Sequence, residues 1–205
     1  MEGNSLLNRQ WFPFSDDNYP NDLKIVGIDP GSYTLGVSIL TVSSLLRLLS
    51  IEAYTLRLEH HLETYADRDN FNRKYEVLEH LLYERLLKIS PIAIGIESPF
   101  IQTARANAVR PLLLTNNAIH RAIHRVNNDS FIGNIPPRTI KKFLLVEDIT
   151  SKESVTKALL KNEDVIRCLS KDEIKAFDEH SIDAIGAGMF MLHTLDRWSC
   201  NNDLK

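Results

Sequence analysis

A chain of 205 residues is long enough for one domain with additions, and 43% hydrophobic and 25% charged residues are typical of a globular protein. No apolar run approaches the roughly 18–20 residues of a membrane helix, and the first residues lack the basic and apolar regions of a secretory signal. Two cysteines give neither a disulfide framework nor a CxxC metal site. These observations exclude membrane-spanning and disulfide-stabilised classes and predict a protein of a reducing compartment, with no membrane partner.

The net charge of −3 conceals an uneven distribution of charge. Residues 101–161 hold ten Lys or Arg against four Asp or Glu, a surplus of six positive charges, and the rest of the chain carries the opposite excess. A segregated basic region indicates an anionic partner. An accidental solvated face explains the same numbers, so the charge alone leaves both interpretations open.

Hydrophobic patterns divide the chain into an N-terminal arm (residues 1–22), a domain (23–198) and a C-terminal tail (199–205). Short apolar runs predict strands, steps of three and four predict helices, and Pro and Gly mark the turns. In chain order we expect strands at 24–29, 35–43 and 46–56, a helix at 68–89, a strand at 92–97, a helix at 103–126, a strand at 131–135, a helix after Pro136-Pro137, a helix at 151–161, and a last helix from Asp178 to about Asp196. This order predicts an α/β fold, a mixed sheet flanked by helices.

Two carboxylates close segments that are predicted to be buried strands. Asp29 ends the first strand directly before Pro30-Gly31, and Glu97 ends the strand 92–97. Taken alone, Asp29 is typical of a turn. Glu97 taken alone is typical of a residue at a sheet edge whose hydrogen bonds are satisfied. Two carboxylates at the ends of neighbouring strands repel each other unless a cation lies between them.

His180 and Asp183 lie three residues apart, so on a helix both project from nearly the same face. The small residues of IGAG follow them and allow this helix to pack closely against a sheet. Each could be an ordinary surface or capping residue. Together with Asp29 and Glu97 they form an oxygen-rich set with one imidazole, which suits Mg²⁺ or Mn²⁺ better than a structural zinc.

Four segments, in this order, resemble the motifs of RuvC-type Holliday-junction resolvases. IVGIDPGSYTLGVSIL resembles their first strand and turn, AIGIESPF their second motif, and EHSIDAIGAG their last motif. Before the last one, PPRTIKKFLLVEDITSKESV resembles a segment in which two lysines approach DNA, here Lys141 and Lys152. The resemblance covers residues 24–196 in outline. It implies an RNase H-like mixed five-stranded sheet flanked by helices. The arm has no counterpart, and a chain with such additions suits a phage or other viral version.

The resemblance also implies a mechanism, that of a metal-dependent endonuclease that resolves four-way DNA junctions by paired cuts. Asp29, Glu97, His180 and Asp183 would be both the catalytic and the metal-binding residues, with two Mg²⁺ per site and Mn²⁺ able to substitute. The products would carry 5′-phosphate and 3′-hydroxyl ends. The expected location is the cytoplasm of a bacterium or of a phage-infected host.

Cations of the basic region are expected to bind DNA phosphates, which orients the substrate without reading its sequence. We expect this role for Arg138, Lys141, Lys142, Lys152 and Lys157. Phe100 would stack on an unpaired base at the branch point, although core packing beside Pro99 is an equal alternative.

A four-way junction has two-fold symmetry and needs two opposed cuts, which predicts a homodimer. Helix 103–126 is the expected dimer surface because it presents apolar residues on related faces, namely Ala104, Ala108, Leu112, Ile119 and Ile123.

Three other functions remain possible from the sequence. A related RNase H-like nuclease could use the same site on flaps, Y-forks or RNA precursors. A non-catalytic binder of branched DNA could keep the fold, although none of the expected carboxylates is missing. A phosphotransferase of the actin and sugar-kinase type has a similar opening turn, but it needs two such domains and a later glycine-rich phosphate loop.

Overall fold

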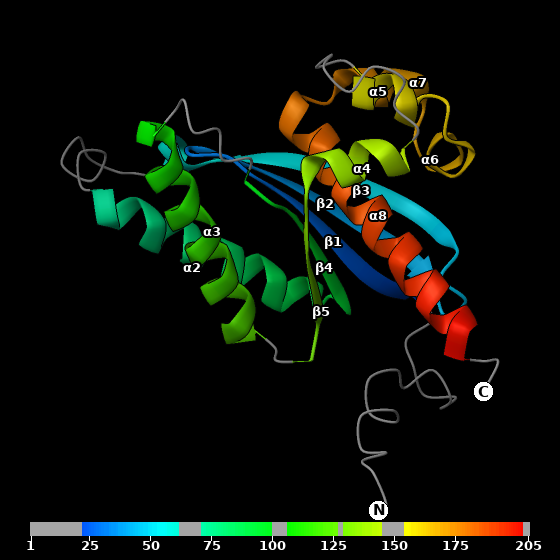
Figure 1. Ribbon diagram of the computed structural model, residues 1–205, viewed down its shortest axis with the longest axis horizontal. Helices are drawn as coiled ribbons and strands as arrows, with labels where there is room; N and C mark the ends of the chain where they lie inside the picture. The colour runs from blue at the N-terminus through cyan, green and yellow to red at the C-terminus, as the bar shows by residue number, and fades with distance from the viewer. Residues whose placement is uncertain (1–21, 62–70, 100–105, 127–128, 145–153, 203–205) are drawn as a thin grey trace, which may run out of the picture.

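The computed structural model describes residues 22–61, 71–99, 106–126, 129–144 and 154–202 (Figure 1). Its elements, in chain order, are β1 (Asp22–Pro30), β2 (Thr34–Ser43), β3 (Leu48–Arg57), the 3-10 helix η1 (Leu58–His61), α2 (Phe71–Ile89), β4 (Ala93–Glu97), α3 (Ala106–Val126), β5 (Phe131–Ile135), α4 (Pro137–Phe143), α5 (Ser154–Leu159), α6 (Glu163–Cys168), α7 (Lys171–Ala176) and α8 (Glu179–Asn202). Within these ranges no helix is long and apolar enough to cross a membrane.

The five strands form one mixed sheet in the order β3-β2-β1-β4-β5. The first three strands pair antiparallel, whereas β4 runs parallel to both β1 and β5. Because β1 and β4 are adjacent and parallel, their carboxyl ends lie at the same edge of the sheet. This topology confirms the predicted five-stranded α/β fold and places Asp29 and Glu97 at one edge.

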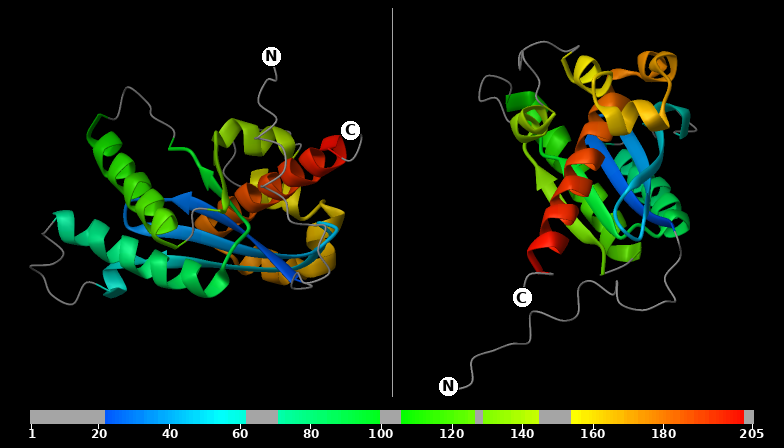
Figure 2. Two further views of the ribbon diagram at one scale, coloured as in Figure 1. Left: turned by 90° about the horizontal axis from the view of Figure 1, so that it is seen from below. Right: turned by 90° about the vertical axis from the view of Figure 1, so that its right-hand side faces the viewer.

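Helices cover both faces of the sheet, as the two views of Figure 2 show. On one face α2 and α3 bury a stripe that includes Leu78, Leu82, Ile119 and Ile123 against the strands. On the other face α8 lies across β1, β2 and β4, with α4 to α7 beside it. The apolar residues that recur every three or four positions in the sequence are therefore the ones that pack into these two cores.

The backbone of α8 packs directly onto the strands, with almost no side chains between. A Cβ atom on Gly27 of β1 would overlap the Ala184 carbonyl, and one on Gly36 of β2 would overlap the backbone of His180. Ser38 of β2 donates a buried hydrogen bond from Oγ to the Ala184 carbonyl at 2.8 Å. Glycine in these strands therefore fixes how deeply the start of α8 sits on the sheet.

The sequence missed α6 and α7, although both carry capping signals. The Asn162 side chain accepts hydrogen bonds from the first turn of α6, and Ser170 with Glu173 forms a capping box at α7. The last helix is also longer than predicted, since α8 runs to Asn202, into the segment assigned to a tail. Residues 1–21 of the predicted arm, 103–105 and 151–153 lie outside the described residues.

The predicted dimer face of helix 103–126 needs one correction. Ile119 and Ile123 are fully buried in the chain's own core and cannot contact a second copy. They are buried because the apolar stripe of α3 packs against the sheet. The outward side of α3 carries other residues, of which Leu113 is exposed.

The close packing of α8 gives the first prediction. Gly27→Ala should lower the free energy of unfolding by at least about 3 kcal/mol, because the new methyl group meets backbone that cannot move aside. Gly133→Ala is the matched control in β5, where the methyl group meets the end of the Met191 side chain rather than backbone, and it should cost clearly less than Gly27→Ala. Urea unfolding of both variants measures the difference, and equal costs would contradict this account of the packing.

Candidate active site

Four chemically active side chains come together where β1, β4 and α8 meet. Asp29 is the penultimate residue of β1, and Glu97 is the last residue of β4. His180 and Asp183 lie in the first turn and a half of α8, above the same edge of the sheet. The structure therefore brings together all four residues that the sequence predicted, although their chemical roles stay predictions.

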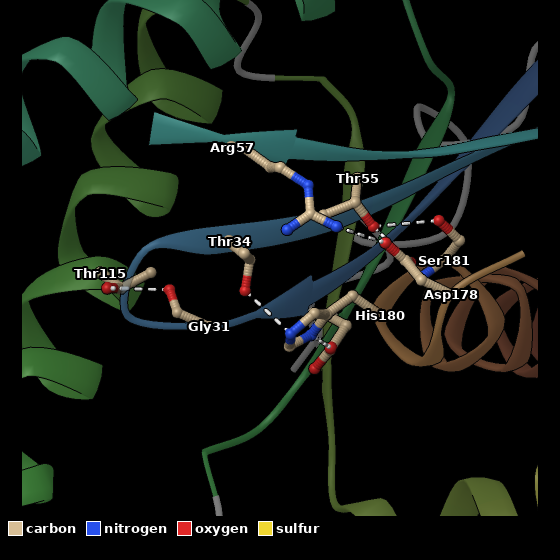
Figure 3. Close-up of polar contacts among 9 residues, drawn as sticks. Gly31, Thr34, Thr55, Arg57, Thr115, Asp178, His180 and Ser181 are labelled. Atoms are coloured by element: carbon tan, nitrogen blue, oxygen red, sulfur yellow. Dashed lines mark hydrogen bonds and ion pairs between the residues drawn. The ribbon is translucent and has the colours of Figure 1, made fainter. Parts of the chain in front are cut away.

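His180 is held at both ring nitrogens (Figure 3). Its Nδ1 lies 2.6 Å from Oδ2 of Asp29, and its Nε2 lies 2.8 Å from Oγ1 of Thr34. The hydrogen bond to Asp29 is the main reason that the pKa of His180 is raised, against the opposing effect of burial. The hydroxyl of Thr34 can donate to a neutral imidazole or accept from a charged one, so it fixes the ring in either state.

The start of α8 is tied to the edge strand β3 through Asp178. One carboxylate oxygen of Asp178 accepts from the Ser181 backbone N–H at 3.0 Å and from Thr55 Oγ1 at 2.5 Å. The other oxygen lies 3.4 Å from the Arg57 guanidinium (Figure 3). Asp178, where the last helix was predicted to begin, therefore caps α8, and the contacts from β3 orient the turn that carries His180.

Glu97 and Asp183 are placed where their ionised forms are unfavourable. Burial, followed by repulsion from Asp29 and Asp183, raises the pKa of Glu97 to about 8. Burial, followed by repulsion from Asp29 and Glu179, raises the pKa of Asp183 to about 7. Lys141 opposes both shifts, which places its positive charge beside the two acids. Neither carboxylate receives a hydrogen bond within the described part of the chain.

These three acids suit a hard divalent cation, which would offset their repulsion with oxygen ligands. In the described ranges, no three His, Cys, Asp or Glu side chains already meet at one point in the manner of a metal site. The charges of Asp29, Glu97 and Asp183 therefore interact, although their side chains do not converge on one point. To bind one ion together, the three side chains would have to turn toward one another. The chemistry of this donor set, three carboxylates with an imidazole beside them, fits such a metal.

The predicted DNA-binding residues are only partly described. Arg138 and Lys142 on α4 and Lys157 on α5 are exposed, whereas Lys141 is half-buried against the acids. Phe100 and Lys152 lie outside the described residues. Two cations of the basic region do not add to its net positive charge. Arg121 and Arg125 on α3 both pair with Glu79 of α2, at 2.6 and 3.0 Å.

Solved structures share this arrangement of strands and helices. RuvC of T. thermophilus in complex with a Holliday junction substrate matches 86% of this chain and 96% of its own, with a TM-score of 0.62 and 14% identity. The chain has a RuvC-type resolvase fold. A second Thermus thermophilus RuvC structure covers the same shares of both chains, with a TM-score of 0.58 and 17% identity. The yeast mitochondrial Holliday junction resolvase Ydc2 covers 90% of this chain and 82% of its own, with a TM-score of 0.55 and 16% identity.

Neither a protein-family profile nor a curated protein sequence matches the chain. At these identities, the RuvC-type likeness is one of fold. The sequence motifs had predicted that fold from four short segments in the right order.

Sequence reasoning missed the residues that support the site. Thr34 stands five residues after Asp29, but its contact with His180 spans 146 positions, and the Thr55 contact with Asp178 spans 123. Nothing local in the sequence reports a pair at such separations. Both strands hold several other polar residues, so neither threonine stands out in the sequence.

The raised pKa values predict how metal-free protein responds to pH. Because folded Glu97 and Asp183 hold their protons to about pH 8 and 7, against ordinary values of 4.5 and 3.8, the free energy of unfolding should fall as pH rises from 5 to 8.5. His180 adds to the same trend, since its pKa is raised too. Urea titrations in EDTA measure the slope, and Mg²⁺ should restore stability at the alkaline end.

Glu97→Gln tests the cause of that slope. The amide cannot ionise, so the variant should be more stable than the wild type at pH 8.5 without metal, and it should gain less from Mg²⁺. A variant with the pH slope of the wild type would contradict the electrostatic description of the site.

Proposed function

We propose that this protein is a metal-dependent endodeoxyribonuclease that cuts branched DNA, with four-way junctions as its substrate. One observation carries the proposal: three acids and a histidine from β1, β4 and α8 gather at the carboxyl edge of a RuvC-type sheet, in a state that a divalent cation would relieve. The likeness to structures of junction resolvases supports the choice of substrate.

Asp29, Glu97 and Asp183 would hold the metal, with His180 beside them. Bound Mg²⁺ or Mn²⁺ supplies charge that neutralises the scissile phosphate and lowers the pKa of a water molecule for in-line attack. Hydrolysis that releases the 3′ oxygen leaves 5′-phosphate and 3′-hydroxyl ends.

The chain's own groups would perform the remaining tasks. Asp29 and Thr34 hold the imidazole of His180 at both nitrogens, so the ring can accept or return a proton without turning away. Lys141 faces the acids and would meet the phosphate next to the cut.

Arg138, Lys142 and Lys157 would bind DNA phosphates, because they are exposed on α4 and α5, which both pack against α8. Paired cuts on a two-fold junction require two copies of the site. We assign the contact between copies to the outward side of α3, where Leu113 is exposed.

A cleavage assay tests the proposal. In Mg²⁺, an immobile four-way junction should be nicked symmetrically, in preference to flap, Y-fork, linear duplex and structured RNA substrates. Asp29→Asn should lower the rate by about three orders of magnitude, the effect of several kcal/mol of lost transition-state stabilisation. The control Asp172→Asn changes an exposed carboxylate on α7 and should cut like the wild type.

The pattern of cutting decides between the alternatives. Preferential cutting of flaps, forks or RNA would support the proposed active site but would show that four-way junctions are not its substrate. Junction binding without cutting in either Mg²⁺ or Mn²⁺ would reject the nuclease and favour a non-catalytic DNA-binding protein.

Thr34 gives a separate prediction about positioning. Thr34→Val removes the partner of His180 Nε2 and should lower kcat about 10- to 100-fold, the usual range for the loss of a supporting hydrogen bond, with little change in junction affinity. The pH dependence of kcat should shift as well, because the imidazole loses one of its two partners. Thr34→Ser keeps the hydroxyl and should restore the wild-type profile. Equal activity of the valine and serine variants would show that the contact plays no part.

A further inference from the structure

A groove of about 560 Å³ lies between α4 and the C-terminal half of α8. The two helices are in contact, and Figure 1 shows the short α4 crossing α8 at an angle. The lining includes cationic and aromatic side chains and, in the part of the chain that the structure describes, no acid. The groove residues that carry charge or an aromatic ring are Lys142, Phe143, Phe190, His193, Arg197 and Trp198.

Three of the aromatic rings that line the groove contact one another. Phe143 meets Phe190 edge to face at a centroid distance of 5.6 Å and stacks on His193 at 5.0 Å. Trp198 is 45% exposed, although Trp is among the largest apolar side chains. Lys142 and Arg197 are exposed on the two opposite walls. Flat rings between two cations are the arrangement that binds stacked bases and their phosphates.

The groove continues the active site along α8. Asp183, Phe190, Thr194 and Arg197 follow one another at intervals of seven, four and three residues, which places them on one face of the helix. With a rise of 1.5 Å per residue, this face extends from about 10 to about 21 Å beyond Asp183. On α4, Lys141 acts on the acids and the next residue, Lys142, lines the groove.

We propose that this groove binds an unpaired strand of nucleic acid that leaves the cleavage site. Its bases would stack on Phe143, Phe190 and Trp198, and its phosphates would contact Lys142 and Arg197. At about 3.4 Å per nucleotide, the groove begins about three nucleotides from the cut. The inference rests on the proposed nuclease function, and it adds a binding site for a single-stranded segment beside the branch point.

Another occupant could be a segment of the chain itself. Residues 1–21 contain Trp11, Phe12, Phe14, Asp16 and Asp17, which match the groove in aromatic character and oppose it in charge. We favour nucleic acid because the groove follows directly from the catalytic acids, and the experiment below separates the two.

The test measures binding of a fluorescent 12-nucleotide oligothymidylate to the full chain in EDTA by anisotropy, so its result does not depend on cleavage. Trp198→Ala should raise Kd at least about five-fold, the effect of one lost base stack. Arg197→Gln should make the slope of log K against log salt shallower by about 0.7, the value for one lost phosphate contact on a single strand. Lys175→Gln, an exposed cation on α7, is the matched control and should bind like the wild type.

Photocrosslinking of wild-type protein to an oligonucleotide that carries 5-iodouracil provides a second readout that needs no variant. Crosslinks should map to residues 139–143 or 190–198. Wild-type affinity in both variants, together with crosslinks only elsewhere, would overturn the proposal. Binding at Trp198 that emerges only in the full-length double variant Asp16→Asn, Asp17→Asn would assign the groove to residues 1–21 and would also overturn it.

Discussion

The contact between the backbone of α8 and the sheet is the constraint on which the site depends. Gly27 and Gly36 leave no side chain between the strands and the first turns of the helix, and Ser38 holds the Ala184 carbonyl against β2. A methyl group at either glycine would push His180 and Asp183 away from Asp29. The hydrogen bond of 2.6 Å between His180 and Asp29 is therefore a result of how closely two pieces of backbone approach.

That close approach makes the ionised forms of Glu97 and Asp183 unfavourable. The fold brings Glu97 and Asp183 into a buried edge beside Asp29, where burial and mutual repulsion oppose their ionisation. A protein selected for stability alone would place amides or apolar residues there. Local conflicts of this kind are expected at functional sites, where the rest of the fold compensates for them. Lys141 lowers the cost without removing it, and the proposed cation would offset the remainder.

Most of the sheet could be predicted from the sequence because its signals are local. The strand that ends at Asp29 is an apolar run stopped by Pro30-Gly31, and β5 is the run FIGNI. Asp29 and Glu97 were found because each closes such a run, and His180 and Asp183 because they lie three residues apart at the start of a predicted helix. The supports of His180 were not, since Thr34 and Thr55 meet α8 only after the chain folds. Helices α6 and α7 have six residues each, too few to show a helical periodicity of apolar residues. Their capping residues were the local sign of a helix.

The most direct test of the central claim is a crystal structure of the protein in Mn²⁺, with the metal located by its anomalous scattering. Manganese should lie between Asp29, Glu97 and Asp183, with the three carboxylates turned inward to contact it. A crystal at saturating Mn²⁺ that shows the acids still apart, with manganese absent or bound only elsewhere, would contradict that claim.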